Sequence, residues 1–183
     1  MKLTLLLPAI PDDSWIFAKQ IGVTHALVKA APELSGLAAP DDLDALRTVK
    51  ERFAKEGITL LGLEGDQFDM SRIKRGEPGR DEDLQRYHRM LENMGELGLT
   101  LLCYNFMPRA KTAEFDWHRT DVAVPLRGGS LTTAYDASLA AESTELELSH
   151  EQLWANYTYF IQSVMPVAER CGVKMGLHPD DPP

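Results

Sequence analysis

Residues 94–106 read MGELGLTLLCYNF, a stretch in which a helical pattern ends at Gly98 and an apolar run follows. Glycine past a helix end adopts the left-handed conformation at little cost, which stops the helix and turns the chain. An aliphatic residue and then Thr or Lys come next. The same pattern recurs at residues 22–24, 57–59 and 172–174. Each copy predicts a helix, a turn and a strand, in that order.

The glycine pattern introduces four short apolar runs, at residues 26–28, 60–63, 101–104 and 175–177, and residues 3–7 add a fifth. Strands that alternate with helices predict a parallel sheet with right-handed crossovers. The runs are continuous rather than alternating, which predicts strands covered on both faces. The fold class is therefore α/β.

Helix starts are marked by capping residues. Asp41 follows a proline and is predicted to cap a helix with an apolar stripe, and Asp81 is predicted to open a second helix. Ser149 and Gln152 fit a capping box at the start of a third helix. Pro166 lies inside that third pattern and is predicted to kink or interrupt it.

One segment departs from the alternation. Residues 106–148 contain two prolines, the pair Gly128-Gly129 and a mixture of charged and aromatic residues. Connections of this length are uncommon and often form lids or binding loops. We expect a single domain over residues 1–183 with a long loop at about 106–148 over the carboxyl face of the sheet. An insertion without a role is the alternative.

Composition narrows the class of partner. The chain has 19 basic and 28 acidic residues, a net charge of −9, and no basic stripe, which disfavours nucleic acid and anionic membrane surfaces. A small molecule or another protein is therefore the expected partner. Two cysteines do not make a disulfide framework, and the first apolar run is too short for a signal peptide or a membrane span. We therefore expect a cytoplasmic protein.

Polar side chains at the ends of the predicted strands are the first candidates for a site, because ligands gather there in parallel α/β folds. Glu64 can serve as a metal ligand, a base or a hydrogen-bond acceptor, or simply face water. Asn105 lies between two aromatic residues and either needs a partner or bonds local backbone. His178 precedes two aspartates and suits a divalent metal, with a structural histidine as the alternative. Lys29 completes the set.

The long loop holds a second candidate cluster, FDWHRTD at residues 115–121. Arg119 there can pair bidentately with an anionic substrate, or form a surface salt bridge with a nearby aspartate. The sequence lacks a Walker A motif and a G-x-S-x-G motif. Cys103 lies within a predicted strand and is expected to be buried rather than reactive.

Three stretches together resemble one family. They are CYNFMP at residues 103–108, FDWHRTD at 115–121 and HPDDPP at 178–183. In combination they are similar to the mannonate dehydratases of the xylose-isomerase-like barrel group, and the likeness extends over about residues 57–183. The start of the chain and the stretch before residue 149 depart from the family pattern.

The resemblance implies a (β/α) barrel of the TIM type. A complete barrel takes about 250 residues and eight strands, whereas five βα units are predicted here, so we expect an incomplete barrel. Barrel strands without neighbours leave exposed edges. The expectation is therefore either a truncated gene product or a homo-oligomer in which a second copy covers the open side.

The resemblance also implies a reaction: loss of water from D-mannonate to give 2-dehydro-3-deoxy-D-gluconate, a step of glucuronate catabolism, with Mn²⁺ or another divalent metal. Carried over by position, His178 resembles the first metal ligand, and the family's remaining ligands have no counterpart in this sequence. The positions that resemble the substrate pocket are Glu64, Asn105, Trp117, Arg119 and Asp121. The alternatives are a sugar isomerase or epimerase on the same scaffold, and an inactive fragment.

Overall fold

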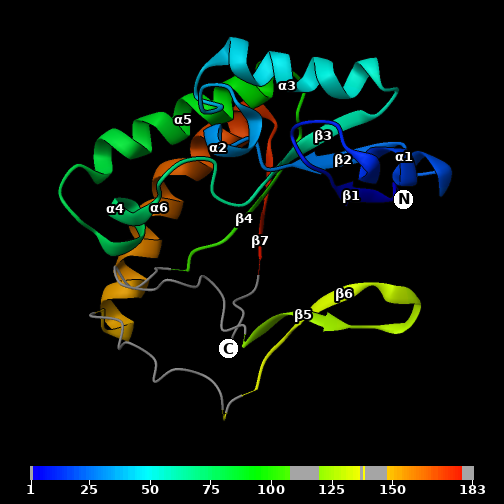
Figure 1. The fold of residues 1–183 in the computed structure, drawn as a ribbon. Coiled ribbons are helices and arrows are strands. Elements are labelled where there is room, and N and C mark those ends of the chain that lie inside the picture. Colours follow the sequence, from blue (N-terminus) through cyan, green and yellow to red (C-terminus); the bar gives the residue numbers. More distant parts are fainter. Residues whose placement is uncertain (1, 108–119, 137, 139–147, 179–183) are drawn as a thin grey trace.

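The fold is seen in a computed structural model that describes residues 2–107, 120–136, 138 and 148–178. Its centre is a parallel sheet of five strands in the order β1-β2-β3-β4-β7 (Figure 1). The strands are β1 Thr4–Leu6, β2 His25–Val28, β3 Thr59–Glu64, β4 Leu101–Tyr104 and β7 Lys174–Leu177. The five predicted strands and their parallel pairing are confirmed, and the sheet stays open at β1 and β7.

The glycine that ends each helix adopts the predicted backbone conformation. The φ angles of Gly22, Gly57, Gly98 and Gly172 are 80°, 74°, 68° and 69°. In all four copies the backbone N–H of the next residue donates to a carbonyl five residues back, at 2.8 to 3.0 Å, which satisfies a carbonyl at the helix end. The aliphatic residue after each glycine is buried in the core, and its burial directs the chain into the next strand.

Six helices connect the strands among the described residues: α1 Asp13–Gln20, α2 Pro32–Ser35, α3 Leu43–Lys55, α4 Ser71–Arg75, α5 Arg80–Glu96 and α6 His150–Cys171. The capping box of Ser149 and Gln152 is confirmed. Helix α6 continues across Pro166, so the predicted interruption does not occur.

Two predicted helix starts are off by one or two residues. Asp42, not Asp41, caps α3, and its carboxylate accepts a hydrogen bond from the N–H of Ala45 at 2.8 Å. Asp41 instead accepts hydrogen bonds from Arg86 of α5. Helix α5 begins at Arg80 after a glycine cap, so Asp81 lies within its first turn. Which of Asp41 and Asp42 caps α3 depends on the backbone angle at each residue, which composition does not reveal.

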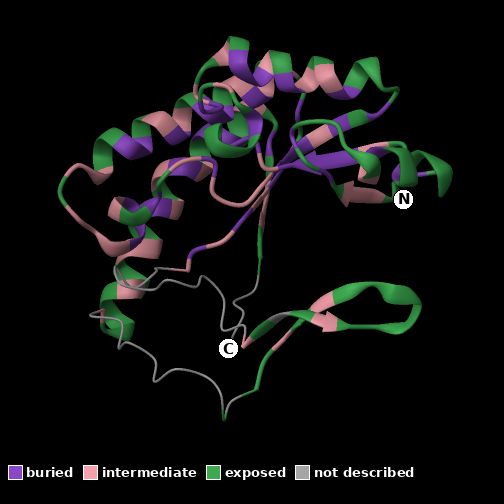
Figure 2. Cartoon of the chain, in the orientation of Figure 1, coloured by how far each residue is buried: buried purple, intermediate pink, exposed green. Residues whose placement is uncertain are grey.

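The helices cover one face of the sheet. Along β4, Leu102 and Tyr104 are buried, whereas Leu101 and Cys103 are half-buried. Successive strand residues point to opposite faces, so only one face of β4 is fully covered. In β2, by contrast, the successive residues Ala26, Leu27 and Val28 are all buried. The residues of β7 are half-buried or exposed along its length (Figure 2). The prediction of strands covered on both faces is therefore confirmed for β2 and wrong for β4 and β7. A barrel that closes would bury this second face.

Helix α6 packs against α5 and α4, and its Phe160 is 0% exposed. The ring of Phe160 lies 5.1 Å from that of Tyr87, 5.3 Å from Phe106 and 5.8 Å from Tyr104, measured between centroids. This aromatic cluster joins α5, α6 and the end of β4. It therefore anchors the segment that carries Asn105.

Part of the long segment has structure of its own. Strands β5 Asp121–Pro125 and β6 Leu131–Ala134 form an antiparallel hairpin, with the 3₁₀ turn η1 Arg127–Gly129 between them. The reading of residues 106–148 as a continuous loop is thus wrong for this portion. The hairpin lies beyond the carboxyl ends of β4 and β7 (Figure 1).

No helix in the part of the chain that the structure describes is both long and apolar enough to cross a membrane.

Candidate functional site

Four polar residues lie at the carboxyl edge of the sheet, as predicted. Lys29 follows β2, Glu64 ends β3, Asn105 follows β4 and His178 follows β7. These strands are successive neighbours and run parallel, so their carboxyl ends share one edge. The N–H of His178 donates to the carbonyl of Tyr104 at 2.7 Å, which extends the pairing of β4 and β7 to the site.

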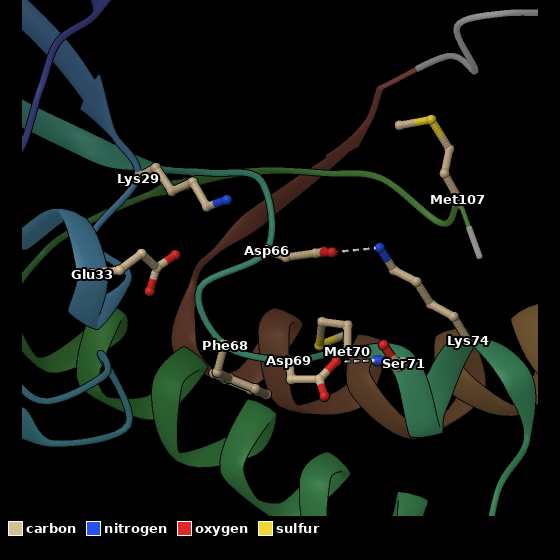
Figure 3. Close-up of a pocket in the computed structure, with 9 residues that line it drawn as sticks. All are labelled: Lys29, Glu33, Asp66, Phe68, Asp69, Met70, Ser71, Lys74 and Met107. Atoms are coloured by element: carbon tan, nitrogen blue, oxygen red, sulfur yellow. Dashed lines mark hydrogen bonds and ion pairs between the residues drawn. The ribbon is translucent and has the colours of Figure 1, made fainter. Parts of the chain in front are cut away.

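A hollow of about 360 Å³ opens at this edge between α2 and α4 (Figure 3). Its volume is in the range of small-molecule sites. Charged and polar side chains dominate the lining, which consists of Lys29, Glu33, Asp66, Phe68, Asp69, Met70, Ser71, Lys74 and Met107. A hollow that offers both cations and carboxylates suits a ligand that carries an anionic group and hydroxyls.

A buried ammonium group organises the far side of the hollow. Lys74 projects from α4, and its side chain is only 4% exposed. Its Nζ donates to the Oδ2 of Asp66 at 2.6 Å and to the Oδ1 of Asn105 at 2.7 Å. Burial of an unpaired charge would be costly, so both partners are needed to hold it. Figure 3 shows Lys74 and Asp66 pointing toward one another.

The loop after β3 is fixed by a second buried polar side chain. Gln67 is 2% exposed. Its Oε1 accepts from the N–H of Ala30 at 2.8 Å, and its Nε2 donates to the carbonyls of Glu64 and Gly65 at 2.8 and 2.9 Å. The amide therefore ties the end of β2 to the end of β3. Asp66 precedes Gln67 in the chain, so these hydrogen bonds also hold Asp66 at the rim of the hollow.

Aromatic side chains flank Asn105 on both sides. Tyr104 and Phe106 are buried, and the hydroxyl groups of Tyr104 and Tyr157 are 3.0 Å apart. Burial and this hydrogen bond raise the pKa of Tyr104, so its phenol stays neutral. These contacts hold the backbone of Asn105 in place, and Lys74 holds its side chain.

Cys103 is half-buried rather than fully buried, which corrects the prediction in part. Desolvation raises the pKa of its thiol, and the nearby Glu64 carboxylate adds to the effect. The thiol form is therefore favoured, as expected for an unreactive cysteine.

His178 is exposed at the end of β7. Among the described residues no group of three or more His, Cys, Asp or Glu side chains could hold a metal ion. Those residues therefore do not make up a complete metal site, and His178 is a candidate for a single ligand.

The structure describes one of the three candidates from the second cluster. Trp117 and Arg119 lie outside the described residues. Asp121 is the exposed first residue of β5, and its carboxylate accepts from the N–H of Ala123 at 2.8 Å. It belongs to the hairpin, not to the edge that carries Glu64 and Asn105.

Sequence reasoning missed Asp66, Gln67 and Lys74. The first two lie two and three residues after Glu64, so the rule that placed Glu64 at a strand end could have included them. Lys74 carries no such signal, because it is one of three basic residues in the short helix α4. Its burial arises only from tertiary packing.

Comparison with known proteins now decides the family. The model of the family described as D-mannonate dehydratase (UxuA) matches residues 22–149 and 143–183. This chain belongs to the D-mannonate dehydratase family. The resemblance in residues 57–183 is confirmed and extends further toward the amino terminus.

Members of the family from streptococci match most of the chain. Mannonate dehydratase of Streptococcus equi subsp. zooepidemicus (strain MGCS10565) is 38% identical, and that of Streptococcus pneumoniae (strain 70585) is 32% identical. Each match covers 91% of this chain and 54% of the relative. This D-mannonate dehydratase family chain thus spans about half the length of these curated relatives.

Two solved structures also match nearly all of this chain and about half of their own length. The crystal structure of mannonate dehydratase from Streptococcus suis serotype2 has a TM-score of 0.79 and 29% identity, and covers 100% of this chain and 54% of that one. D-Psicose 3-epimerase of Clostridium cellulolyticum H10 has a TM-score of 0.55 and 15% identity, over 96% of this chain and 51% of that one. The second likeness shows the fold alone. The TIM-type barrel class is confirmed, with the barrel unclosed among the described residues.

Proposed function

We propose that this chain forms the sugar-acid-binding part of a D-mannonate dehydratase, a hydro-lyase that converts D-mannonate to 2-dehydro-3-deoxy-D-gluconate in glucuronate catabolism. The observation that carries the proposal is the family match, which covers residues 22–183. The polar hollow at the carboxyl edge supports it, because that edge is where barrel enzymes bind their substrates.

The charges of the hollow suit a sugar acid. Lys29 contributes positive charge that attracts a carboxylate, in a protein whose net charge is −9. The charge of Lys74 is compensated by Asp66 at 2.6 Å. Glu33, Asp66 and Asp69 contribute oxygen atoms that accept hydrogen bonds from hydroxyl groups. The ligand class proposed here is therefore a polyhydroxy carboxylate.

The reaction requires a base that takes the proton from C2 and an acid that protonates the departing C3 hydroxyl. The proposed substrate contacts of this chain are Glu64 and Asn105 at the sheet edge and Asp121 on the hairpin, together with Trp117 and Arg119, which lie outside the described residues. Their part is to bind and orient the sugar acid so that C2 and C3 face the base and acid.

We also propose Mn²⁺, or another divalent ion, as the cofactor, with His178 as one ligand. A neutral imidazole nitrogen is a common ligand for such ions. A divalent ion would stabilise negative charge that develops beside the substrate carboxylate. The described residues do not complete its site, so apart from His178 we assign them substrate binding and orientation.

The proposal includes a single domain over residues 1–183 in the cytoplasm. The two cysteines are free thiols, which accords with a reducing compartment. Exposed leucines at the two edges of the sheet, Leu6 at 53% and Leu177 at 51%, support a homo-oligomer that covers them. Sedimentation as a well-folded monomer would contradict the oligomer.

Product analysis tests the function. Purified protein is incubated with Mn²⁺ and either D-mannonate or D-psicose, and the products are identified by NMR. We expect a 2-keto product with a deoxy carbon from D-mannonate and no change in D-psicose. An epimerised ketose, the outcome for the alternative of a sugar isomerase or epimerase, would overturn the proposal. An unchanged D-mannonate solution, under conditions in which the Streptococcus suis relative forms product, would count against activity of this chain alone and favour the alternative of an inactive fragment.

A further inference from the structure

The side chain of Lys74 is fixed from several directions. Its backbone carbonyl accepts a hydrogen bond from the amide of Asn156 on α6 at 3.1 Å, which holds α4 in place. Its side chain is 4% exposed, and its ammonium lies 2.6 Å from the carboxylate of Asp66. Because the carboxylate compensates most of the buried charge, the ammonium can remain protonated and rigid inside the protein.

The ammonium sets the orientation of the Asn105 amide. A lysine ammonium only donates hydrogen bonds, so the amide atom that faces it at 2.7 Å must be the oxygen Oδ1. The N–H of Met107 also donates to this oxygen, at 3.4 Å. The two donors hold the carbonyl end of the amide toward Lys74.

The amide nitrogen of Asn105 therefore points away from Lys74. It has two N–H donors, and the structure gives it no hydrogen-bond partner among the described residues. In that part of the chain no buried side-chain nitrogen or oxygen lacks a partner, so this nitrogen keeps access to solvent. It lies at the carboxyl edge of β4, where the substrate is proposed to bind.

We propose that Lys74 is a positioning residue, which holds the Asn105 amide so that its two N–H donors face an oxygen atom of the bound sugar acid. The proposal rests on the proposed function for the identity of the ligand. If the amide turned over, its oxygen would face the ligand. That oxygen would repel a carboxylate oxygen of the ligand and could not donate a hydrogen bond to a hydroxyl oxygen. Lys74 acts on the ligand through Asn105.

A double-mutant cycle on D-mannonate affinity tests this coupling. Calorimetry measures the dissociation constant for the parent, Lys74→Met, Asn105→Ala and the double variant, with exposed Lys55→Met as the matched control. We expect Lys74→Met to weaken binding about tenfold, the loss of one hydrogen bond. In the Asn105→Ala background the same change should alter binding less than about twofold. An equal loss in both backgrounds would show that Lys74 is only structural and would overturn the proposal.

A second measurement needs no ligand and separates this proposal from the function. The side-chain NH₂ signals of Asn105 in a ¹⁵N spectrum are assigned by their disappearance in Asn105→Ala. We expect Lys74→Met to shift these signals, whereas Lys55→Met leaves them unchanged. Unchanged signals in Lys74→Met would overturn the positioning role, even if the parent binds D-mannonate. A parent that does not bind D-mannonate would count against the proposed function, and the spectrum alone then decides the role of Lys74.

Circular dichroism checks that Lys74→Met folds. If it does not, the variant Lys74→Met with Asp66→Asn replaces it in the NMR measurement, which needs no ligand, because it removes the two paired charges together. The same outcomes then support or overturn the proposal.

Discussion

Replacement of Phe160 by alanine should remove the centre of the aromatic cluster that supports the site. The side chain is 0% exposed and contacts three rings at centroid distances of 5.1 to 5.8 Å. Loss of a buried Phe costs about 3–5 kcal/mol through lost transfer energy and the cavity left behind. Each aromatic pair adds about 0.5–1.5 kcal/mol, so we expect a loss near the upper part of that range, about 4 kcal/mol.

Urea denaturation followed by circular dichroism measures this change in the free energy of unfolding. With a slope of about 2 kcal/mol per molar urea, the midpoint should fall by about 2 M. Phe17→Ala is the matched control, because Phe17 is 60% exposed on α1 and should change stability by less than about 0.5 kcal/mol. A loss below about 1 kcal/mol for Phe160→Ala, or similar losses for both variants, would refute the role of the cluster.

Three further changes test the fold and its titration. Gly62→Ala should destabilise the protein by about 2 kcal/mol or more, because a Cβ there would overlap a backbone carbonyl of β4, whereas Gly176→Ala has open space and should be near neutral; thermal unfolding that shows equal effects would contradict this. Ser149→Ala should cost about 1 kcal/mol in urea unfolding, since it removes the cap of α6, and no loss would mean that the capping box is not formed. Because burial raises the pKa of Tyr104, its phenol stays neutral in the folded state, whereas in the unfolded chain the phenol ionises at about pH 10. The contribution of Tyr104 to the free energy of unfolding should therefore be constant below that pH and fall above it, so the alkaline loss of stability should be shallower in Tyr104→Phe; identical alkaline profiles would contradict the raised pKa.

The five strands and their parallel pairing were predictable because the signals for them are local. A glycine such as Gly98 takes a positive φ where it ends a helix. The apolar run that follows it is stable only when it packs into the core. Capping residues are less certain, since Asp41 and Asp42 are chemically equal and only the backbone angle decides which one caps α3.

The hairpin escaped prediction because its strands pair only with each other. The pair Gly128-Gly129 gave a turn signal, and both residues have positive φ, at 81° and 80°. The flanking strands β5 and β6 are short and largely exposed, so they lack the apolar runs that marked the sheet. Prolines and charged residues in the surrounding segment favoured the reading as a loop.

The site was predictable to the extent that it lies at strand ends. Glu64, Asn105 and His178 follow apolar runs, and a parallel sheet brings such positions to one edge whatever the helices do. Lys74 is different, because its place beside Asn105 depends on how α4 packs between the β3 loop and α6. Contacts between residues 31 positions apart leave no pattern in the sequence.

Shift mapping of D-mannonate on the backbone amide spectrum tests most directly whether the carboxyl edge of this sheet is the sugar-acid site. We predict that titration shifts the amide signals of Glu64, Asn105 and His178 and of the loop at residues 65–70, and leaves those of β1 unchanged. Shifts confined to the opposite edge or to the outer helices, or none at any concentration that saturates the Streptococcus suis relative, would contradict it.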